Sequence, residues 1–422
     1  MTAEPDTPPT LLATLSGADR PGVTSHLFAS LADLDVAVLD VEQVVVRGHL
    51  TLAVLLAPGR HGSAADARVA KVAYDLGMTV TTALGSGDSS RNRTGRAAVV
   101  ALGQPLTASA VSAVTATVAA TGANIDRIRR LSRYPVTTIE FDVSGAEVAR
   151  LRRDLARVSA QEGVDIAVSP SGLARRGRRL VVLDVDSTLI QQEVIELLAA
   201  HAGRGEEVHA VTEAAMRGEI DFTESLRRRV AVLAGLPASV IEEVAHQVRL
   251  TPGARTLVRT LHRLGFTVAL VSGGFTPIVE SIARDLGIRH VRANDLEIVD
   301  GHLTGRVLGD VVDRAGKAAA LREFARAESL PLSRTVAIGD GANDLDMLQS
   351  AGLGVAFNAK PVVRSQADTS VNVPYLDTVL FLLGISREEI EEADRQPGGV
   401  GTGLSPRGPD TPARENEWGE PR

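Results

Sequence analysis

The sequence of 422 residues contains no cysteine. Disulfide bonds, thiolate metal sites and cysteine nucleophiles are therefore excluded. Aromatic residues are also scarce, at 3% of the chain, so the cores must be built from aliphatic side chains. The single tryptophan, Trp418, lies in a C-terminal segment rich in glycine, proline and charge, which cannot bury enough apolar surface to fold. We expect disordered tails at residues 1–9 and 394–422.

The chain also lacks an uninterrupted run of about 18 apolar residues, the length that a helix needs to span a bilayer. Its first nine residues are polar, acidic and rich in proline, unlike the basic and apolar stretches of a signal peptide. We therefore expect a cytoplasmic protein. The net charge of −7, with both signs interspersed, argues against nucleic acid or an anionic membrane as a partner.

Three regions are expected between the tails. Residues 10–86 carry strand and helix signals in the order βαββαβ, and residues 97–170 repeat that order after a polar linker. This order predicts two ferredoxin-like α/β sandwiches. In the third region, residues 180–390, strands and helices alternate as in a doubly wound, Rossmann-like parallel sheet. A mostly helical insert, at about residues 195–248, follows the first strand of that region.

Acidic residues follow the first strand of the third region. The apolar run 180–183 predicts a buried parallel strand, and Asp184 and Asp186 come directly after it. Residues two apart project to the same side of an extended chain, so both carboxylates can face one reaction centre. Open α/β sheets bind their ligands at the carboxyl ends of such strands. Taken alone, the pattern also fits an ordinary strand end before an acidic helix N-terminus.

Three further polar segments follow in order. Strand 268–271 ends in Ser272-Gly273-Gly274, where backbone amides and a hydroxyl can hold a phosphate. Lys317, near the start of a helix, supplies a positive charge. Strand 335–338 ends in the segment GDGAND, residues 339–344, whose carboxylates suit Mg²⁺, although Mn²⁺ favours the same oxygen ligands. Each segment alone also fits a plain turn or a solvated side chain, but the ordered set predicts a site for phosphoryl transfer.

The ordered motifs DxDST, SGG, Lys and GDGxND resemble those of the haloacid dehalogenase superfamily of phosphotransferases, over about residues 180–385. The resemblance implies a Rossmann-like core with a cap inserted after the first strand. It implies that Asp184 is the nucleophile, which forms an aspartyl-phosphate, and that Asp186 is the general acid and base. It also implies a Mg²⁺ cofactor.

The resemblance assigns the remaining polar residues of these motifs as well. The implied metal ligands are Asp184, the backbone carbonyl of Asp186, and Asp340. The groups implied to hold the phosphoryl oxygens are Ser272, Gly273 and Lys317. Asn343 and Asp344 are implied to order the metal shell and Lys317, and Asn343 also belongs to the implied substrate site.

Within the superfamily the cap must decide the substrate, because the fold does not. The cap sequence resembles that of phosphoserine phosphatases, which implies that Glu193 binds the substrate ammonium and Arg229 its carboxylate, with Met216 and Phe222 shielding the site. One anion and one bidentate cation suit a zwitterionic amino acid. From the residues alone, Glu193 also fits an ordinary first-turn acid. Arg229 fits a solvated basic cluster, and Met216 and Phe222 fit core residues.

The expected reaction is therefore hydrolysis of O-phospho-L-serine to L-serine and phosphate, the last step of serine biosynthesis. One alternative is another enzyme of this superfamily, either a phosphotransferase that passes the phosphoryl group to homoserine or a phosphoprotein phosphatase. A second alternative is a non-catalytic regulator that binds amino acids. The presence of every motif carboxylate and of Lys317 argues against the regulator.

Residues 10–86 resemble an ACT domain, a small regulatory module that often binds amino acids, because the segment DRPGVT, residues 19–24, follows the first strand. Its Pro/Gly turn opens a helix whose N–H groups can meet a ligand carboxylate. Asp19 and Gly22 are the candidate regulatory residues, and L-serine is the expected effector. The second repeat departs from this signature at residues 103–107. Alternatively, both repeats serve only dimerisation, and a homodimer is our expectation.

Overall fold

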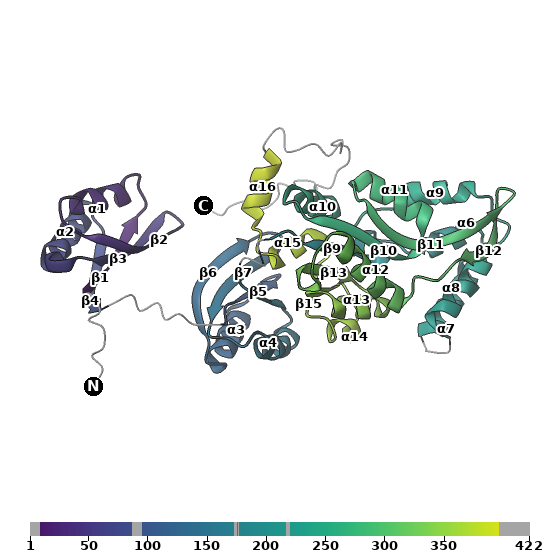
Figure 1. Cartoon of the computed structure of the whole chain (residues 1–422), viewed down its shortest axis with the longest axis horizontal. Helices are drawn as coiled ribbons and strands as arrows, with labels where there is room; N and C mark the ends of the chain where they lie inside the picture. Colours follow the sequence, from purple (N-terminus) through teal and green to yellow (C-terminus); the bar gives the residue numbers. More distant parts are fainter. Residues whose placement is uncertain (1–8, 87–94, 173–174, 176, 217–219, 396–422) are drawn as a thin grey trace, which may run out of the picture. The chain divides into compact units, whose positions relative to one another are not determined.

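The computed structural model of the chain describes most of its length (Figure 1). The described residues are 9–86, 95–172, 175, 177–216 and 220–395. Contacts between residues divide the chain into two compact units, residues 1–93 and 94–422. The two expected tails lie outside the described residues, except at their inner ends. Pro9 begins a strand, and Asp394 and Arg395 end a helix, so those three residues were wrongly placed in the tails.

The first unit is an antiparallel sheet with helices on one face. Its elements are β1 (Pro9–Ala18), α1 (Val23–Leu31), β2 (Ala37–Val46), β3 (His49–Ala57), α2 (Gly62–Asp75) and β4 (Thr79–Ser86). The strand order is β2-β3-β1-β4, as expected for a ferredoxin-like sandwich. In β1, Leu11, Ala13 and Leu15 are buried in a core shared with the helices. Leu12, which projects to the other face, is 42% exposed.

The second unit begins with the same fold. Its elements are β5 (Ala97–Gly103), α3 (Ala108–Ala120), β6 (Asn124–Ser132), β7 (Thr137–Ser144), α4 (Val148–Glu162) and β8 (Asp165–Pro170), with the strand order β6-β7-β5-β8. Every residue of β5 is buried. Val99 and Ala101 pack in a core with α3 and α4, whereas Val100 and Leu102 share a core with the third region. The third region therefore covers the sheet face that lies opposite α3 and α4.

The third region is built on one seven-stranded sheet with the order β12-β11-β10-β9-β13-β14-β15. Its strands are β9 (Leu180–Leu183), β10 (Thr267–Phe275), β11 (His290–Val299), β12 (His302–Leu308), β13 (Thr335–Gly339), β14 (Leu353–Phe357) and β15 (Thr369–Val371). Neighbouring strands are parallel, except for β12, which pairs antiparallel with β11 at one edge. The expected end of β10 at Val271 is wrong, because the strand continues through an irregular register to Phe275.

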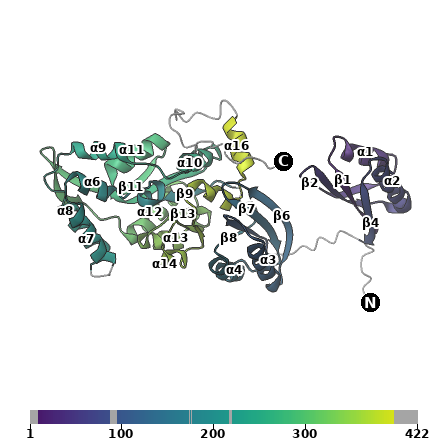
Figure 2. The same ribbon diagram turned by 180° about the vertical axis from the view of Figure 1, so that it is seen from behind.

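Helices cover both faces of this sheet (Figures 1 and 2). They are α10 (Ala254–Arg263) and α11 (Thr276–Leu286) on one face, and α12 (Arg314–Ala327) and α13 (Leu345–Ser350) on the other. In β9, Val181 and Leu183 share a core with α10 and α11, whereas Leu180 and Val182 share one with α12 and α13. Burial on both faces explains why the run 180–183 is apolar throughout.

A helical cap follows β9, as predicted. Its helices are α6 (Val194–His201), α7 (Gly205–Met216), α8 (Phe222–Ala231) and α9 (Ser239–Gln247). Backbone hydrogen bonds join the segment between α8 and α9 to the hairpin of β11 and β12, including Gly235 N–H to the Leu303 carbonyl and Leu303 N–H to the Leu236 carbonyl. The base of the cap is therefore anchored to the sheet edge.

Shorter elements complete the region. They are the helical turns Val185–Leu189, Leu332–Arg334, Ala342–Asp344 and Leu376–Thr378, and the helices α14 (Pro361–Arg364), α15 (Val379–Leu382) and α16 (Arg387–Arg395). Arg259 and Arg263 of α10 both donate to the carboxylate of Asp394, which explains why α16 extends into the expected tail. Among the described residues, none of the helices is long and apolar enough to cross a bilayer.

Two glycines with the same left-handed backbone provide a test of packing around α10. Gly253, at its start, has φ +83°, and a Cβ there would lie 2.8 Å from the backbone nitrogen of Asp377. Gly122 has φ +81° and no atom within 4 Å of the same position. We expect Gly122→Ala to lower the free energy of unfolding by about 1 kcal/mol and Gly253→Ala by about 1–3 kcal/mol more. Urea unfolding followed by circular dichroism measures both, and equal losses would contradict this packing.

Candidate active site

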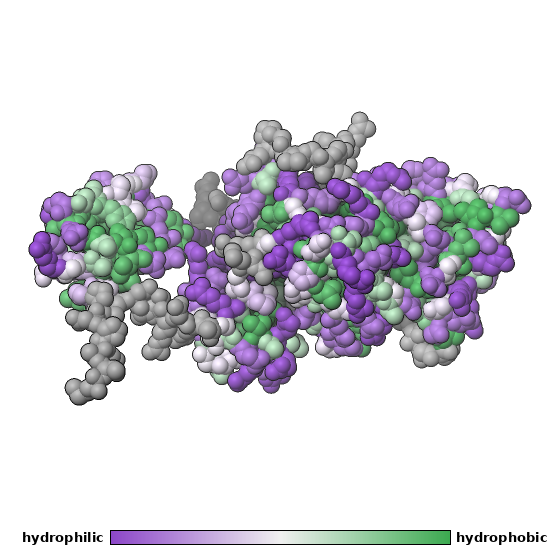
Figure 3. Space-filling view, viewed as in Figure 1, coloured by the Kyte–Doolittle hydropathy of each residue, from purple (hydrophilic) through white to green (hydrophobic). Residues whose placement is uncertain are grey.

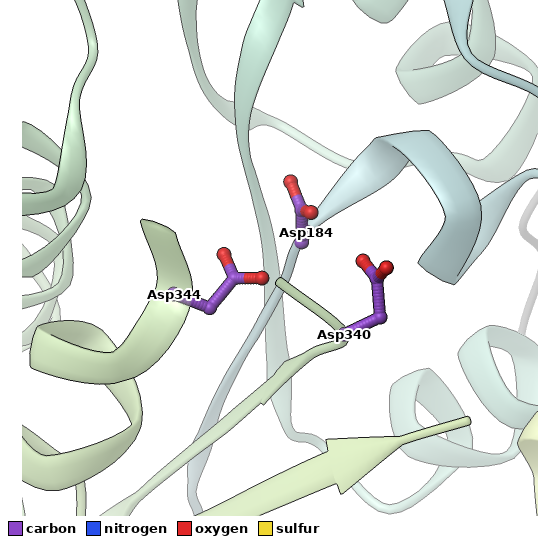
Figure 4. A group of neighbouring side chains, drawn as sticks. All are labelled: Asp184, Asp340 and Asp344. Atoms are coloured by element: carbon purple, nitrogen blue, oxygen red, sulfur yellow. The ribbon is translucent and has the colours of Figure 1, made fainter. Parts of the chain in front are cut away.

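Acidic residues from two neighbouring strands meet at the carboxyl edge of the sheet. Asp184 follows β9 and Asp340 follows β13, which lie side by side in the sheet. Asp344 comes from the helical turn after β13. One carboxylate oxygen from each of these three residues lies within 4.8 Å of the others (Figure 4). The structure therefore brings together acidic side chains that are about 160 residues apart in the sequence.

Lys317 lies inside this group of carboxylates. Its Nζ donates to Oδ1 of Asp184 at 2.6 Å and to Oδ1 of Asp344 at 2.7 Å, and its side chain is completely buried. Burial acts to lower the pKa of the ammonium, but attraction by Asp184 and Asp344 outweighs it and raises the pKa. The alternative that Lys317 is a solvated surface residue is therefore wrong.

Both carboxylate oxygens of Asp344 already have partners. Oδ1 accepts from Lys317, and Oδ2 accepts from the backbone N–H of Gly341 at 2.9 Å. A Cβ on Gly339 would lie 2.4 Å from the carboxyl carbon of Asp344, so this close approach requires glycine. The contacts suit Asp344 as the residue that orients Lys317 rather than as a metal ligand.

The charges in this cluster fit a divalent cation. Burial and repulsion by Asp344 raise the pKa of Asp184 well above its usual value, although Lys317 opposes the shift. Burial and Asp344 likewise raise the pKa of Asp340 to about 7, and Thr188 donates to this carboxylate at 3.2 Å. Three carboxylates thus face one ammonium. An oxygen-coordinated cation such as Mg²⁺ would relieve their repulsion. Asp184, Asp340 and the backbone carbonyl of Asp186 are the residues that would hold it.

The carboxyl group of Asp186 is positioned by two donors. Oδ1 accepts from the backbone N–H of Val194, at the start of α6, at 2.8 Å. Oδ2 accepts from the hydroxyl of Ser272 at 3.1 Å. Burial and repulsion by Glu193 raise the pKa of Asp186 to about 6, despite these hydrogen bonds. Such a carboxyl group can donate a proton and later accept one near neutral pH.

Ser272 occupies a different place from the glycines that follow it. Its side chain is fully buried, and its hydroxyl also accepts the backbone N–H of Gly274 at 2.7 Å. Gly273 and Gly274 line the cavity above the carboxylates, but Ser272 does not. To donate to a phosphoryl oxygen, this hydroxyl must therefore turn away from its acceptor, Asp186. The bond between Ser272 and Asp186 was not evident from the sequence.

A cavity of about 770 Å³ lies between the core and the cap. The core contributes Asp184, Asp186, Gly273, Lys317, Asp340 and Asn343, and the cap contributes Glu193, Phe222 and Arg229. Arg229 is half-buried in the wall, whereas Arg227 and Arg228 are exposed and do not line the cavity. Burial lowers the pKa of Arg229, and Glu193 acts against this shift. The Met216 side chain lies outside the described part of the chain.

Two cap residues touch the catalytic loops directly. Phe222 lies over Gly273, where a Cβ would come within 3.0 Å of its ring. Glu193, the residue before α6, accepts a hydrogen bond of 2.7 Å from the hydroxyl of Ser187. Ser187 has φ +58°, a left-handed conformation that is uncommon for a residue other than glycine. No local sequence signal indicates this conformation, so Ser187 was missed as a partner of Glu193.

Other residues in the cavity wall were also missed. Arg314 and Lys360 add positive charge, and Val362 and Val363 add apolar surface. Both basic residues lie outside the motifs, in segments whose position depends on tertiary packing. No local sequence signal distinguishes them from surface residues.

The candidate regulatory residues lie at the start of α1 in the first unit. Gly22 has φ +99°, and its carbonyl oxygen accepts from the hydroxyl of Ser25 at 3.0 Å. Asp19 donates its backbone N–H to the carbonyl of Gly48 at 2.8 Å. In the second unit, Thr107 caps α3 with its own side chain. The two helix starts therefore differ, in keeping with the departure of the second repeat from the signature.

Comparison with known proteins agrees with this fold. The haloacid dehalogenase-like hydrolase family matches residues 181–349, and ACT domain families match residues 9–82 and 96–169. The chain is 58% identical over 397 residues to a phosphoserine phosphatase of Streptomyces coelicolor, covering 94% of this chain and 97% of the relative. It is 55% identical over 395 residues to one of Mycobacterium tuberculosis, covering 92% and 97%.

A solved structure shares most of the architecture. It is that of a probable phosphoserine phosphatase from Vibrio cholerae, with 34% identity and a TM-score of 0.54, covering 70% of this chain and 88% of that one. The fold and the site thus define a haloacid dehalogenase-like hydrolase with two ACT domains, as predicted. Within that class, the chain belongs to the phosphoserine phosphatase family. We refer below to the first and second ACT domains and to the third region as the phosphatase domain.

The raised pKa values predict how stability depends on pH and on metal. Without metal, the folded chain keeps protons on Asp184 and Asp340 that the unfolded chain loses near pH 4. The stabilisation that Asp340 contributes therefore falls as pH rises from about 4 to about 7, and that of Asp184 falls in the same direction. Because Mg²⁺ must displace these protons, we expect it to raise Tm more at pH 8 than at pH 6.

Circular dichroism melting with and without excess Mg²⁺ measures this difference. Asp340→Asn should remove the increase in Tm. Asp346→Asn, which changes a neighbouring aspartate that pairs with Arg314, should keep it. An equal increase at both pH values, or one that survives in Asp340→Asn, would contradict the assigned site.

Proposed function

We propose that this chain hydrolyses O-phospho-L-serine to L-serine and phosphate through an aspartyl-phosphate on Asp184. One observation carries the proposal: a single cavity joins a phosphoryl-transfer centre with two oppositely charged residues of the cap. The transfer centre consists of Asp184, Asp186 and Lys317. The cap residues are Glu193 and Arg229.

The first half of the reaction breaks the ester. Phosphate monoesters hydrolyse so slowly unaided that enzymes accelerate the reaction up to about 10²¹-fold. A carboxylate oxygen of Asp184 attacks phosphorus while the bond from phosphorus to the serine oxygen breaks. Asp186 gives its proton to the departing oxygen, which releases serine. Lys317 and the backbone N–H of Gly273 stabilise the charge on the phosphoryl oxygens, together with Ser272 once its hydroxyl turns toward them.

The second half regenerates the enzyme. Asp186, now ionised, accepts a proton from water as the water oxygen attacks phosphorus and the bond to Asp184 breaks. Phosphate then leaves. Mg²⁺ held by Asp184, Asp340 and the Asp186 carbonyl would offset the repulsion between carboxylate and phosphate. Asn343, in the cavity wall, and Asp344, through Lys317, keep this shell ordered.

The cap supplies recognition of the amino acid. Glu193 binds the substrate ammonium, and Arg229 binds its carboxylate through two parallel N–H donors. Phe222 closes the cavity over Gly273, and Met216 is assigned the same shielding role from its sequence position. We place the reaction as the last step of serine biosynthesis, in the cytoplasm.

The two arginines at the end of α8 allow a matched test of this pocket. Arg229→Ala should raise KM for phosphoserine about 10- to 100-fold, because a charge-assisted hydrogen-bonded pair contributes about 1.5–3 kcal/mol. Hydrolysis of p-nitrophenyl phosphate, which lacks the amino-acid groups, should change little. Arg228→Ala, in an exposed neighbour paired with Glu224, should change neither rate.

Phosphate release with Mg²⁺ measures these rates, beside a phosphopeptide and with homoserine as a possible acceptor. Asp184→Asn should abolish activity on every substrate while the circular dichroism spectrum stays unchanged. Equal losses in the two arginine variants would overturn the pocket. Folded, active Asp184→Asn would overturn the nucleophile.

We also propose that the first ACT domain binds L-serine and mediates a homodimer. The start of α1 after Gly22 offers backbone N–H groups for a carboxylate, and Asp19 precedes this turn. Support for the dimer comes from β2, an edge strand of ten residues that are all exposed. Apolar residues gather on the visible face of this unit (Figure 3). The exposed apolar residues of β2 are Val38, Leu39, Val41, Val44, Val45 and Val46.

The effector proposal predicts that serine inhibits the full-length enzyme and raises its Tm. Asp19→Ala should shift the half-inhibiting serine concentration about 10-fold or more, because it removes a polar contact near the ligand. Asp35→Ala changes another exposed acid of the same domain and should leave inhibition unchanged. Inhibition that is purely competitive and identical in all three proteins would show that serine acts only as a product.

A further inference from the structure

A buried carboxylate joins the second ACT domain to the phosphatase domain. Asp165, the first residue of β8, is 4% exposed and faces β15, the edge strand of the phosphatase sheet. Its Oδ1 accepts from the hydroxyl of Ser370 at 2.7 Å. Its Oδ2 accepts from the backbone N–H of Asn372 at 2.8 Å, and the Asn372 side-chain amide is a third donor. All three donors therefore belong to the phosphatase domain.

Burial of this carboxylate is not offset by a direct ion pair among the described contacts. Burial raises the pKa of Asp165, while its hydrogen bonds with Asn372 and Ser370 act in the opposite sense. A buried charge is costly unless its oxygens are well satisfied, so the positions of Ser370 and Asn372 are closely constrained by Asp165. Thr369 adds a bond of 2.9 Å from its hydroxyl to the carbonyl of Ile166.

This contact continues to the wall of the substrate cavity. The side-chain oxygen of Asn372 accepts from Arg364 at 3.1 Å, and Arg364 is the last residue of α14. On its other side α14 faces the cavity, which Val362 and Val363 line. The helix is only four residues long: Val363 packs in the core, and Arg364 joins its C-terminal end to Asn372. The position of that end therefore depends on Asn372.

We propose that Asp165 is a positioning residue of the phosphatase site, which holds the α14 wall of the cavity in place through Asn372 and Arg364. The second ACT domain thereby contributes to substrate binding without touching the substrate. This inference rests on the proposed function, because it takes phosphoserine as the substrate. We expect loss of the Asp165 contact to weaken substrate binding rather than to slow the chemical step. Asp184 follows β9, Asp186 is held by donors on α6 and β10, and Lys317 lies on α12, so none of the three depends on α14.

Full-length Asp165→Asn tests the proposal. An amide offers one acceptor oxygen where the carboxylate offered two, and its N–H groups would face the donors of Asn372. We expect KM for phosphoserine to rise about 3- to 30-fold, with kcat within about twofold of the wild type. Glu140→Gln is the matched control, because Glu140 is also buried between the domains but pairs with Arg129 and Arg175 near Gly384 instead. It should lower Tm and leave KM unchanged.

Arg364, which is exposed, allows a second test of the same contact without a substitution at a buried residue. Arg364→Gln removes the bond to Asn372 from the surface side and should raise KM to a similar extent. Because both changes act through one contact, Asp165→Asn with Arg364→Gln should raise KM no further than either change alone. Additive effects, or an unchanged KM in Arg364→Gln, would overturn the inference. A KM in Asp165→Asn equal to that of Glu140→Gln would also overturn it. A wild-type chain that fails to hydrolyse phosphoserine would instead refute the proposed function.

Discussion

The buried ammonium of Lys317 is the charge on which the arrangement of the site depends. Three carboxylates meet at the end of two neighbouring strands, and such a group cannot be buried ionised without compensation. Lys317 supplies part of it through its bonds to Asp184 and Asp344. The chain has only three lysines among its 45 basic residues, and this one is completely buried. A compact ammonium fits between two carboxylates where a planar guanidinium would need more room.

The groups proposed for catalysis and those proposed for recognition come from different segments around this charge. The carboxylates proposed to react lie at the carboxyl ends of buried strands, which pack against helices on both faces of the sheet. The groups assigned to the amino acid come from the cap, at Glu193 and Arg229. Asp186 links the two sets, because it accepts from Ser272 of the core and from the first backbone amide of α6. A change in the cap can therefore alter the substrate while the chemistry stays the same.

Much of this fold could be predicted because its signals are local. The apolar run 180–183 indicated a strand buried on both faces, and the motifs after the strands indicated where the carboxylates would meet. The contacts of Ser187 and Ser272 could not be predicted in this way, since they depend on a left-handed residue and on an irregular strand end. The choice of Arg229 over its two neighbours came from the resemblance alone, because only the position of α8 against the cavity distinguishes the three side chains. β12 was not foreseen either, because the alternation of strands and helices suggested only parallel neighbours.

The apolar pattern of one strand also bears on how the second ACT domain packs. Residues 97–103 are apolar throughout, whereas the equivalent strand of the first repeat mixes apolar and polar residues. A strand that is apolar on both sides must be covered on both sides. The difference indicated that the second ACT domain packs against another part of the chain, and the structure identifies that part as the phosphatase domain.

The burial of β5 on both faces limits how many N-terminal residues can be removed from the enzyme. A chain that starts at Gly95 retains every contact described for the second unit. A chain that starts at Arg179 loses Val100 and Leu102 from the shared core, and it leaves Ser370 and Asn372 without their buried acceptor. Such a fragment would expose an apolar surface that promotes aggregation. A loss of activity in this fragment would therefore reveal nothing about regulation. The second ACT domain thus shares its core with the phosphatase domain and forms one folded unit with it.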